Sequence, residues 1–350
     1  MTVLIILFAI LLFSVIIFIH ELGHFIAARI FGVTVHEFAI GMGPALWKHK
    51  GKRETIYSVR CIPIGGFCAM EGEDGDSDKP GSFATKSKLA RFIILAAGAF
   101  MNVVLGFIIS LIVVIMTCGG GIATNKVDSV VPDAPAAKFL QPGDKIVEIN
   151  GHGVNIQQEI SVGLSLGDSD NSFDVKVRRN GKTLSFNDIK VYEQEKDGVK
   201  NKMIGIICAV DKPSVISVLR ESFFQTVYMG KVVFLSLSML FHGEAKMSDL
   251  SGPVGVVEQM GNAAKSGGGG IVGFINLLYL AGFISVNIGI MNLLPFPALD
   301  GGRILFIVIE LVTRRRIPAE KEGIVHFIGI ILLFGLMIFA TWNDILRLLS

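Results

Sequence analysis

The chain has 350 residues, of which 18% are charged and 51% are hydrophobic. Ordinary soluble domains carry roughly 25% charged residues, and the mean hydropathy of this chain is +0.60. This composition excludes a disordered chain, a collagen-like chain and a disulfide-dense secreted module. The net charge of +2 gives no indication of nucleic-acid binding. Four cysteines without a CxxC pair are too few for a disulfide scaffold.

The hydrophobic residues are concentrated in four uncharged runs, at 3–19, 92–117, 271–299 and 324–342. A membrane-spanning helix needs roughly 20 mostly apolar residues, and each run meets this length, the first with help from its flanks. The first run has the apolar character of a signal peptide, but it lacks a basic N-terminal region and a cleavage site of the A-x-A type. We therefore predict four transmembrane helices.

The orientation follows from the short loop after the third run. This loop contains five basic residues: Arg303, Arg314, Arg315, Arg316 and Lys321. Short basic loops stay in the cytoplasm. With four spans, residues 20–91 and 300–323 then face the cytoplasm, while both termini and residues 118–270 lie outside.

The long outer segment has two parts. Residues 119–212 are polar and rich in glycine, with an alternating run at 173–179 followed by an Asn-Gly turn, which predicts a small β-rich domain. Residues 213–242 have apolar residues at helical spacing but include Arg220 and Glu221, which favours an amphipathic helix on the membrane surface. A fifth span here would place the two motifs described next on opposite faces of the membrane.

The first motif is His20-Glu21-Leu22-Gly23-His24, an HExxH sequence. Residues four apart lie on one face of a helix, so two imidazoles can bind one Zn²⁺ with the glutamate beside a metal-bound water. The motif lies at the inner end of an apolar span, where ionisable residues are costly and usually functional. The alternative is an interfacial cluster whose side chains reach toward water.

Asp300 is the strongest candidate for a third ligand, because a zinc hydrolase usually has three protein ligands plus water. It follows the third run, on the same predicted membrane face as His20. Pro295 and Pro297 must interrupt a regular helix there, and irregular backbone at membrane depth is tolerated where it is buried in protein or lines a wet cavity. The alternative is a span that ends in turns with a capping aspartate.

These motifs resemble the site-2 protease family of intramembrane zinc metalloproteases, in its bacterial RseP-like branch. HELGH (20–24) and NLLPFPALDGG (292–302) carry the resemblance. Other segments follow in the family's order: FAIGMGP (38–44), YSVRCIPIGGF (57–67), LSGPVGV (250–256) and SVNIGIMNLLPFPALDGGRILF (285–306). Residues 130–154 resemble a bacterial PDZ domain, whereas the better-known Gram-negative members carry two in tandem.

The resemblance implies a set of site residues. His20, His24 and Asp300 would bind one Zn²⁺ per chain, Glu21 would be the general base and Asn292 would contact substrate. Residues 57–67 would form a membrane-associated β-hairpin that pairs with an unwound substrate strand. Gly65 and Gly66 would let a strand edge approach other backbone closely, and an exposed edge can add a strand.

The resemblance also implies substrates and a location. The family cleaves transmembrane segments of single-span proteins after another protease has trimmed their outer part, and thereby releases anti-sigma factors or clears signal-peptide remnants. The expected partners are such substrates and the lipid bilayer, with the PDZ domain contacting the trimmed end and no nucleic acid bound. The expected location is the bacterial cytoplasmic (inner) membrane, with the active site toward the cytoplasm and the PDZ domain outside.

The predicted fold is a polytopic α-helical membrane protein of about four transmembrane helices, with an inserted extracytoplasmic β-rich PDZ domain and a membrane-associated β-hairpin loop. The expected parts are two catalytic membrane regions, the PDZ domain and the surface helix. In chain order they cover residues 1–118 (membrane), 119–212 (PDZ), 213–242 (surface helix) and 243–350 (membrane).

Two other classes of function remain open at this point. A zinc or cation transporter would place ionisable residues on several spans, whereas here they collect at one face of two. A non-catalytic PDZ-bearing membrane scaffold with a structural metal does not need the intact Glu21. Outside the motifs, Asn102 is expected to be an interhelical hydrogen-bonding residue rather than a catalytic one. His326 is expected to be a packed or interhelical hydrogen-bonding residue rather than a fourth ligand. A disulfide between Cys118 and Cys208 is left open.

Overall fold

The computed structural model describes residues 2–51, 53–73, 75, 77–166, 171–196, 199–243, 252–315 and 317–349. Parts of two predicted features lie outside these ranges, namely Arg316 of the basic loop and Leu250 and Ser251 of the 250–256 segment. The chain forms two compact units. The first combines Met1–Ile109 with Met229–Ser350, and the second is Ser110–Tyr228.

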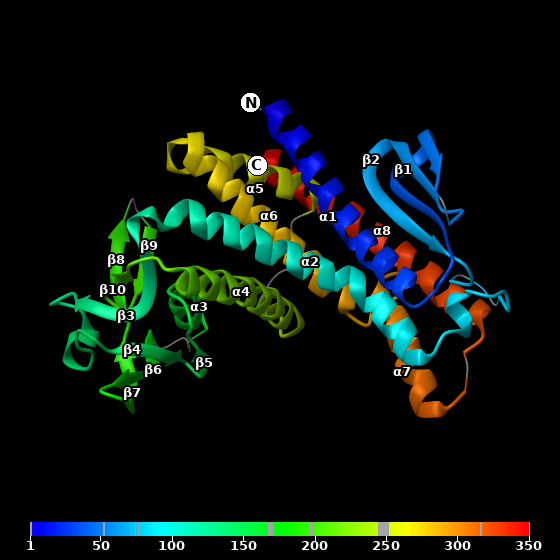
Figure 1. Cartoon of the computed structure of the whole chain (residues 1–350). Helices are drawn as coiled ribbons and strands as arrows, with labels where there is room; N and C mark the ends of the chain where they lie inside the picture. The colour runs from blue at the N-terminus through cyan, green and yellow to red at the C-terminus, as the bar shows by residue number, and fades with distance from the viewer. Residues whose placement is uncertain are drawn as a thin grey trace. The chain divides into compact units, whose positions relative to one another are not determined.

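Most of the first unit is helical, as the uncharged runs predict (Figure 1). The helices of the chain are α1 (Thr2–Ile30), α2 (Lys88–Thr117), α3 (Gln158–Ser165), α4 (Val215–Phe241), α5 (Pro253–Lys265), α6 (Gly270–Leu293), α7 (Asp300–Thr313) and α8 (Ala319–Leu349). Ile16, Met260 and Ala281 are buried together, so α1, α5 and α6 share one apolar core. A second core joins Ala28 of α1 to Ile94 of α2.

Five of these helices are long and apolar enough to cross a membrane: Ile5–Ile30, Lys88–Gly120, Val215–Phe241, Gly270–Leu293 and Glu320–Arg347. Four coincide with the predicted spans. The additional one, α4, is the segment that the sequence analysis places on the membrane surface. Length and composition therefore allow one more span than predicted.

A long antiparallel hairpin follows α1 and lies beside it (Figure 1). Its strands are β1 (Val35–Lys50) and β2 (Ile56–Met70), so the predicted hairpin of residues 57–67 is instead most of one strand of a larger hairpin. Both strands bend, and Ile40 of β1 pairs with Val59 on one side and Gly66 on the other. The hairpin is thereby a small sheet in which β1 lies between two parts of β2. The last part of β2, residues 66–69, pairs with β1 on one side. Among the described residues, the other side of this segment pairs with no strand.

The second unit is β-rich, as predicted. Its strands are β3 (Ile122–Val130), β4 (Lys145–Ile149), β5 (His152–Gly153), β6 (Ser172–Arg179), β7 (Lys182–Lys190), β8 (Tyr192–Lys196), β9 (Val199–Met203) and β10 (Ile206–Asp211). The main antiparallel sheet has the order β10-β3-β4-β6-β7, with β5 paired to β4. Asn180 and Gly181 both have positive φ in the β6–β7 turn, as a two-residue hairpin turn requires. Cys118 and Cys208 are both free, so the structure contains no disulfide between them.

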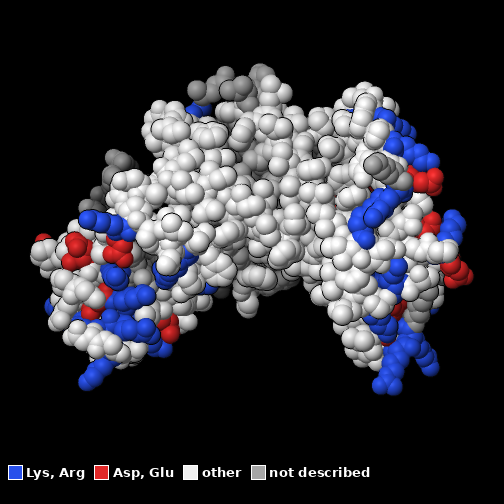
Figure 2. All heavy atoms as spheres, in the orientation of Figure 1, with Lys and Arg blue, Asp and Glu red and all other residues white. Residues whose placement is uncertain are grey.

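Charged side chains are unevenly distributed within each unit. On the face shown in Figure 2, the helices of the first unit are almost free of charge, and Lys, Arg, Asp and Glu gather over the β1–β2 hairpin and the end of α7. In the second unit they gather over the strands. Uncharged helical surface is typical of segments that lie in lipid.

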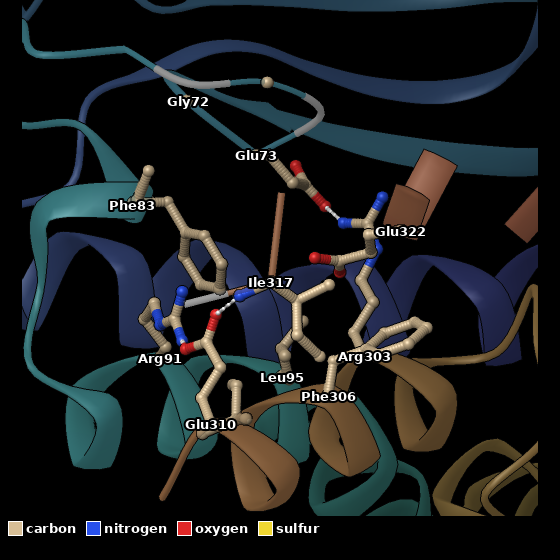
Figure 3. Close-up of a pocket in the computed structure, with 13 residues that line it drawn as sticks. Gly72, Glu73, Phe83, Arg91, Leu95, Arg303, Phe306, Glu310, Ile317 and Glu322 are labelled. Carbon is tan, nitrogen blue, oxygen red and sulfur yellow. Dashed lines mark hydrogen bonds and ion pairs between the residues drawn. The ribbon is translucent and has the colours of Figure 1, made fainter. Parts of the chain in front are cut away.

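Two ion pairs hold α7 in the first unit (Figure 3). Arg91 at the start of α2 pairs with Glu310 near the end of α7, and both side chains are buried. Glu310 also accepts a hydrogen bond from the backbone N–H of Ile317 at 3.2 Å. Arg303, one turn into α7, pairs with Glu73 just after β2. These contacts fix both ends of the helix that begins with Asp300.

The Arg91–Glu310 pair gives a stability prediction. Glu310→Ala leaves Arg91 as an uncompensated buried charge, which typically costs about 3–5 kcal/mol. We expect a marked fall in the denaturation midpoint of the detergent-solubilised chain. Replacing both partners, by Arg91→Met with Glu310→Leu, should recover most of this loss. Lys50→Ala removes one partner of an exposed pair with Glu54 and should leave the midpoint nearly unchanged. Equal midpoints for Glu310→Ala and Lys50→Ala would contradict the prediction.

Candidate metal centre

The structure brings His20, His24 and Asp300 together, although 280 residues separate the first from the last. One potential ligand atom from each lies within 4.8 Å of the others. Nε2 of His20 is 3.0 Å from Oδ2 of Asp300, Nε2 of His24 is 3.3 Å from the same oxygen, and the two Nε2 atoms are 3.2 Å apart. Both imidazoles are buried, with less than a tenth of each residue exposed.

Local helix geometry positions the two histidines. They are four residues apart on α1, and their rings meet edge to face with centroids 4.8 Å apart. The ring nitrogens of both therefore point to the same place. This is the arrangement that the HExxH spacing predicts.

Asp300 reaches the histidines because the third apolar run is not one helix. α6 ends at Leu293, and α7 begins at Asp300 after a segment that contains Pro295 and Pro297. Within it, Ala298 has a φ of +78°. At Gly301 the backbone of Leu293 and Leu294 passes so close that a Cβ atom would overlap it. The predicted helix interruption is thus present, and it turns the carboxylate back toward α1.

The donor set fits zinc. Two ligands bound about 2.1 Å from a tetrahedral zinc ion lie about 3.4 Å apart, and the three measured separations are 3.0, 3.2 and 3.3 Å. Two imidazoles with one carboxylate are a donor combination found in catalytic zinc sites. Such a set leaves a fourth position for water or substrate.

One face of α2 surrounds the histidines. The backbone carbonyl of Ile94 accepts a hydrogen bond from Nδ1 of His24 at 2.8 Å. Four residues later, Gly98 leaves the room that the rings occupy, since a Cβ there would overlap His24 and come within 2.8 Å of Cε1 of His20. Another four residues on, the Asn102 side chain lies 3.4 Å from Nδ1 of His20. From the sequence, Asn102 is predicted only as an interhelical residue, and Ile94 and Gly98 are not predicted at all. The spacing of Gly98 and Asn102 within an apolar run was the available signal.

Glu21 lies between the metal cluster and the hairpin. Its carboxylate interacts electrostatically with His20, His24 and Asp300, and it accepts a hydrogen bond from the backbone of Cys68. Gly66 lies against it, because a Cβ at Gly66 would be 3.5 Å from Cγ of Glu21. The structure thus places the candidate base against the last part of β2.

Cys68 carries a thiol close to Glu21, to which its backbone donates a hydrogen bond. Burial raises the pKa of its thiol above the usual range, and the negative charges of Glu21 and Glu73 raise it further. A neutral thiol is a poor metal ligand, since the thiolate is the form that binds metal. Among the described residues, Cys68 is not part of the group of donors that could hold one metal ion.

The other residues considered for the site, Gly65, Asn292 and His326, are not among the three clustered donors. Gly65 has a φ of +94° in β2, next to Gly66. Asn292 lies half-buried in the last turn of α6. Nδ1 of His326 on α8 accepts a hydrogen bond from the backbone N–H of Ala298 at 3.3 Å. His326 therefore supports the connection between α6 and α7 as an interhelical hydrogen-bonding residue.

A buried pair of histidines with a carboxylate and an adjacent glutamate, set among apolar helices, defines a membrane-embedded metallohydrolase. Residues 8–336 match peptidase family M50. The chain therefore belongs to this family, the site-2 proteases, and is a zinc metalloendopeptidase of a bacterial membrane. The resemblance read from the motifs is confirmed, and family membership decides against a transporter or a non-catalytic scaffold.

Relatives cover nearly the whole chain. The regulator of sigma-W protease RasP of Bacillus subtilis is 31% identical, over 97% of this chain and 97% of its own. Zinc metalloprotease RasP of Geobacillus kaustophilus is 29% identical over 96% of each chain. A Clostridium perfringens chain that is named provisionally as a zinc metalloprotease is 38% identical, over 97% of this chain and 98% of its own.

One solved structure with a likeness is the PDZ domain of an SdrC-like protein from Listeria monocytogenes. It is 29% identical, with 25% of this chain and 88% of that chain covered and a TM-score of 0.22. At this TM-score, the assignment of residues 119–212 as a PDZ domain stays a prediction from the sequence.

Gly98 gives a prediction for the centre. Gly98→Ala places a methyl group where the imidazoles lie, so the rings must move apart and the three donors no longer match a tetrahedral ion. We expect zinc content and proteolysis to fall together, measured by metal analysis and cleavage of a single-span substrate. Gly335→Ala on α8 is the matched control, because a Cβ there meets nothing within 4 Å. Full zinc content in Gly98→Ala would contradict the expectation.

Proposed function

We propose that the chain cleaves transmembrane segments of single-span membrane proteins, using zinc held by His20, His24 and Asp300 and Glu21 as the general base. The observation that carries the proposal is the convergence of these three donors beside Glu21, within helices long enough to lie in a membrane. Family membership shows that the chain is a zinc protease. The geometry supports the choice of residues for the chemistry. One zinc ion per chain fits one three-donor site.

A bound zinc ion supplies Lewis-acid activation of water and of the scissile carbonyl. Glu21 takes the proton of the attacking water and passes it to the departing nitrogen of the substrate. Its contact with the backbone of Cys68 orients the carboxylate. Burial of His20 and His24 keeps their nitrogens directed at one point without a competing shell of water.

Substrate presentation is the second part of the proposal. A peptide bond in a helix is protected by its own hydrogen bonds, so the substrate must unwind before cleavage. The unpaired side of residues 66–69 can accept an extended segment by strand addition, and Gly66 allows close approach of that backbone to Glu21. Gly65 and Asn292 complete the proposed substrate-binding residues.

The name of one relative supports the choice of substrates. A relative named as a regulator of sigma-W protease supports an anti-sigma factor as substrate, with signal-peptide remnants as the other class. The enzyme and these substrates would lie in the same bilayer. Identification of the single-span proteins that accumulate when the protease is inactivated would test this choice.

We further propose four spans, with the active site toward the cytoplasm and α4 at the membrane surface. The contact between His20 and Asp300 supports this count. If α2, α4 and α6 all crossed, α6 would run opposite in direction to α1 and end at the outer face. Asp300 would then lie across the membrane from the inner end of α1. Crossing by α2 and α6 alone brings the two motifs to one side.

The sidedness can be tested by cysteine labelling. In a cysteine-free background, a single cysteine at position 315 should resist a membrane-impermeant reagent in intact cells and react after lysis, because its basic loop stays in the cytoplasm. A cysteine at position 212 should react in intact cells. Labelling of position 315 from outside would overturn the proposed topology.

Residues 119–212 are proposed to be a substrate filter that contacts the trimmed end of the substrate. None of the three clustered donors comes from this segment. Deleting it should therefore preserve cleavage of pre-trimmed substrates and allow cleavage of untrimmed ones. A deletion variant that inserts and binds zinc, but cleaves no trimmed substrate, would refute the filter role.

Glu21→Gln separates the base from the ligands. The variant keeps the size of the side chain but cannot accept the proton, and loss of a general base typically costs about 10²–10⁴ in rate. It should retain zinc, whereas His20→Ala, His24→Ala or Asp300→Ala should lose zinc and activity together. Metal analysis with cleavage of a single-span substrate in detergent, and a chelator control, provides the measurement. A zinc-free Glu21→Gln would make Glu21 a ligand or a structural residue, and near-normal turnover would remove it from the chemistry.

A further inference from the structure

Asn102 is fully buried and lies against the metal cluster without being one of its donors. Its amide nitrogen faces Nδ1 of His20 at 3.4 Å, and its amide oxygen has no hydrogen-bond partner among the described residues. An unpaired buried amide oxygen is costly, typically by about 1–3 kcal/mol. The position therefore calls for an explanation beyond helix packing.

The chemistry of the imidazole supplies that explanation. A neutral imidazole carries one N–H, and a nitrogen that binds metal must present its lone pair. His20 directs Nε2 at the other donors, so its proton belongs on Nδ1, which then needs an acceptor. The amide nitrogen of Asn102 cannot accept, whereas the amide oxygen can. A half turn of the amide exchanges these two atoms with little change in shape.

We propose that Asn102 is a positioning residue of the metal centre, whose amide oxygen accepts the hydrogen bond from Nδ1–H of His20 and so holds Nε2 free for the metal. The carbonyl of Ile94 does the same for His24. Both acceptors lie on one face of α2, on either side of Gly98, which gives the rings their space. A partner of this kind typically changes metal affinity about 10–100-fold.

A second contact of Asn102 provides a control. Oγ of Ser285 on α6 donates to the backbone carbonyl of Asn102 at 2.8 Å, and both residues are fully buried. This hydrogen bond links α2 to α6 without touching an imidazole. Its removal perturbs packing at the same place and leaves the proposed acceptor intact.

The experiment measures zinc affinity of the full chain in detergent, by competition with a chromophoric chelator. Asn102→Leu removes the acceptor and should weaken zinc binding about 10–100-fold. Asn102→Asp can accept but, when ionised, cannot donate, and it should bind zinc at least as tightly as the wild type. Ser285→Ala should match the wild type. The visible absorption spectrum of the cobalt-substituted protein should change in Asn102→Leu and persist in Ser285→Ala, since it reports ligand geometry.

The outcomes separate the possibilities. Wild-type affinity in Asn102→Leu would overturn the proposal, and so would weak binding in a folded Asn102→Asp, because a donor would then be what His20 needs. If Asn102→Leu does not fold, the affinity of Asn102→Asp still decides. The inference rests on the proposed ligands. Absence of zinc binding by the wild-type chain, or full binding by His20→Ala, would refute those ligands and with them the role of Asn102, whereas wild-type affinity in Asn102→Leu would refute that role alone.

Discussion

The meeting of one carboxylate with two imidazoles inside a set of apolar helices is the constraint on which the first unit depends. Polar groups buried among apolar side chains are costly unless they are paired or bind a metal. His20, His24 and Asp300 instead place three potential metal-ligand atoms within 3.3 Å of one another. They can do so only if α1, α2 and the start of α7 approach closely. At Gly23, a Cβ would overlap the backbone of Ala97, so small residues make the approach possible.

The same constraint explains the helix interruption and the ion pairs around α7. A continuous helix through residues 271–313 would carry Asp300 away from α1, whereas the break after Leu293 turns it back. A short helix after such a break needs other supports. Arg91–Glu310 ties it to α2, and Arg303–Glu73 ties it to the end of the hairpin. A buried ion pair adds little net stability, but these two pairs fix the position of a proposed metal ligand.

The sequence allowed prediction of those parts of the site whose geometry is local. The HExxH spacing defines a helix face, and the prolines before Asp300 define a break, so both could be recognised without the fold. Ile94 could not, because a backbone carbonyl has no sequence signature. For Gly98 the only signal was its spacing from Asn102, which is weak because a glycine in an apolar run has many uses. The hairpin was underestimated for a related reason. The sequence of residues 57–67 is that of a complete loop. In the structure, the two halves of this strand pair with opposite sides of β1. This pairing depends on a bend that the alternation of side chains does not reveal.

The contact between Glu21 and the hairpin joins two requirements that are separate in a soluble protease. The proposed base must lie beside the metal donors, and an unwound substrate must find hydrogen-bond partners in a place where water is scarce. Residues 66–69 meet both needs, because their backbone touches Glu21 through Cys68 and Gly66 while one side stays unpaired among the described residues. An extended substrate on that side would regain the backbone hydrogen bonds it loses on unwinding. In the proposed function, the strand edge would therefore do more than hold the substrate, since it would lower the cost of exposing a peptide bond at the point where the proposed base can act.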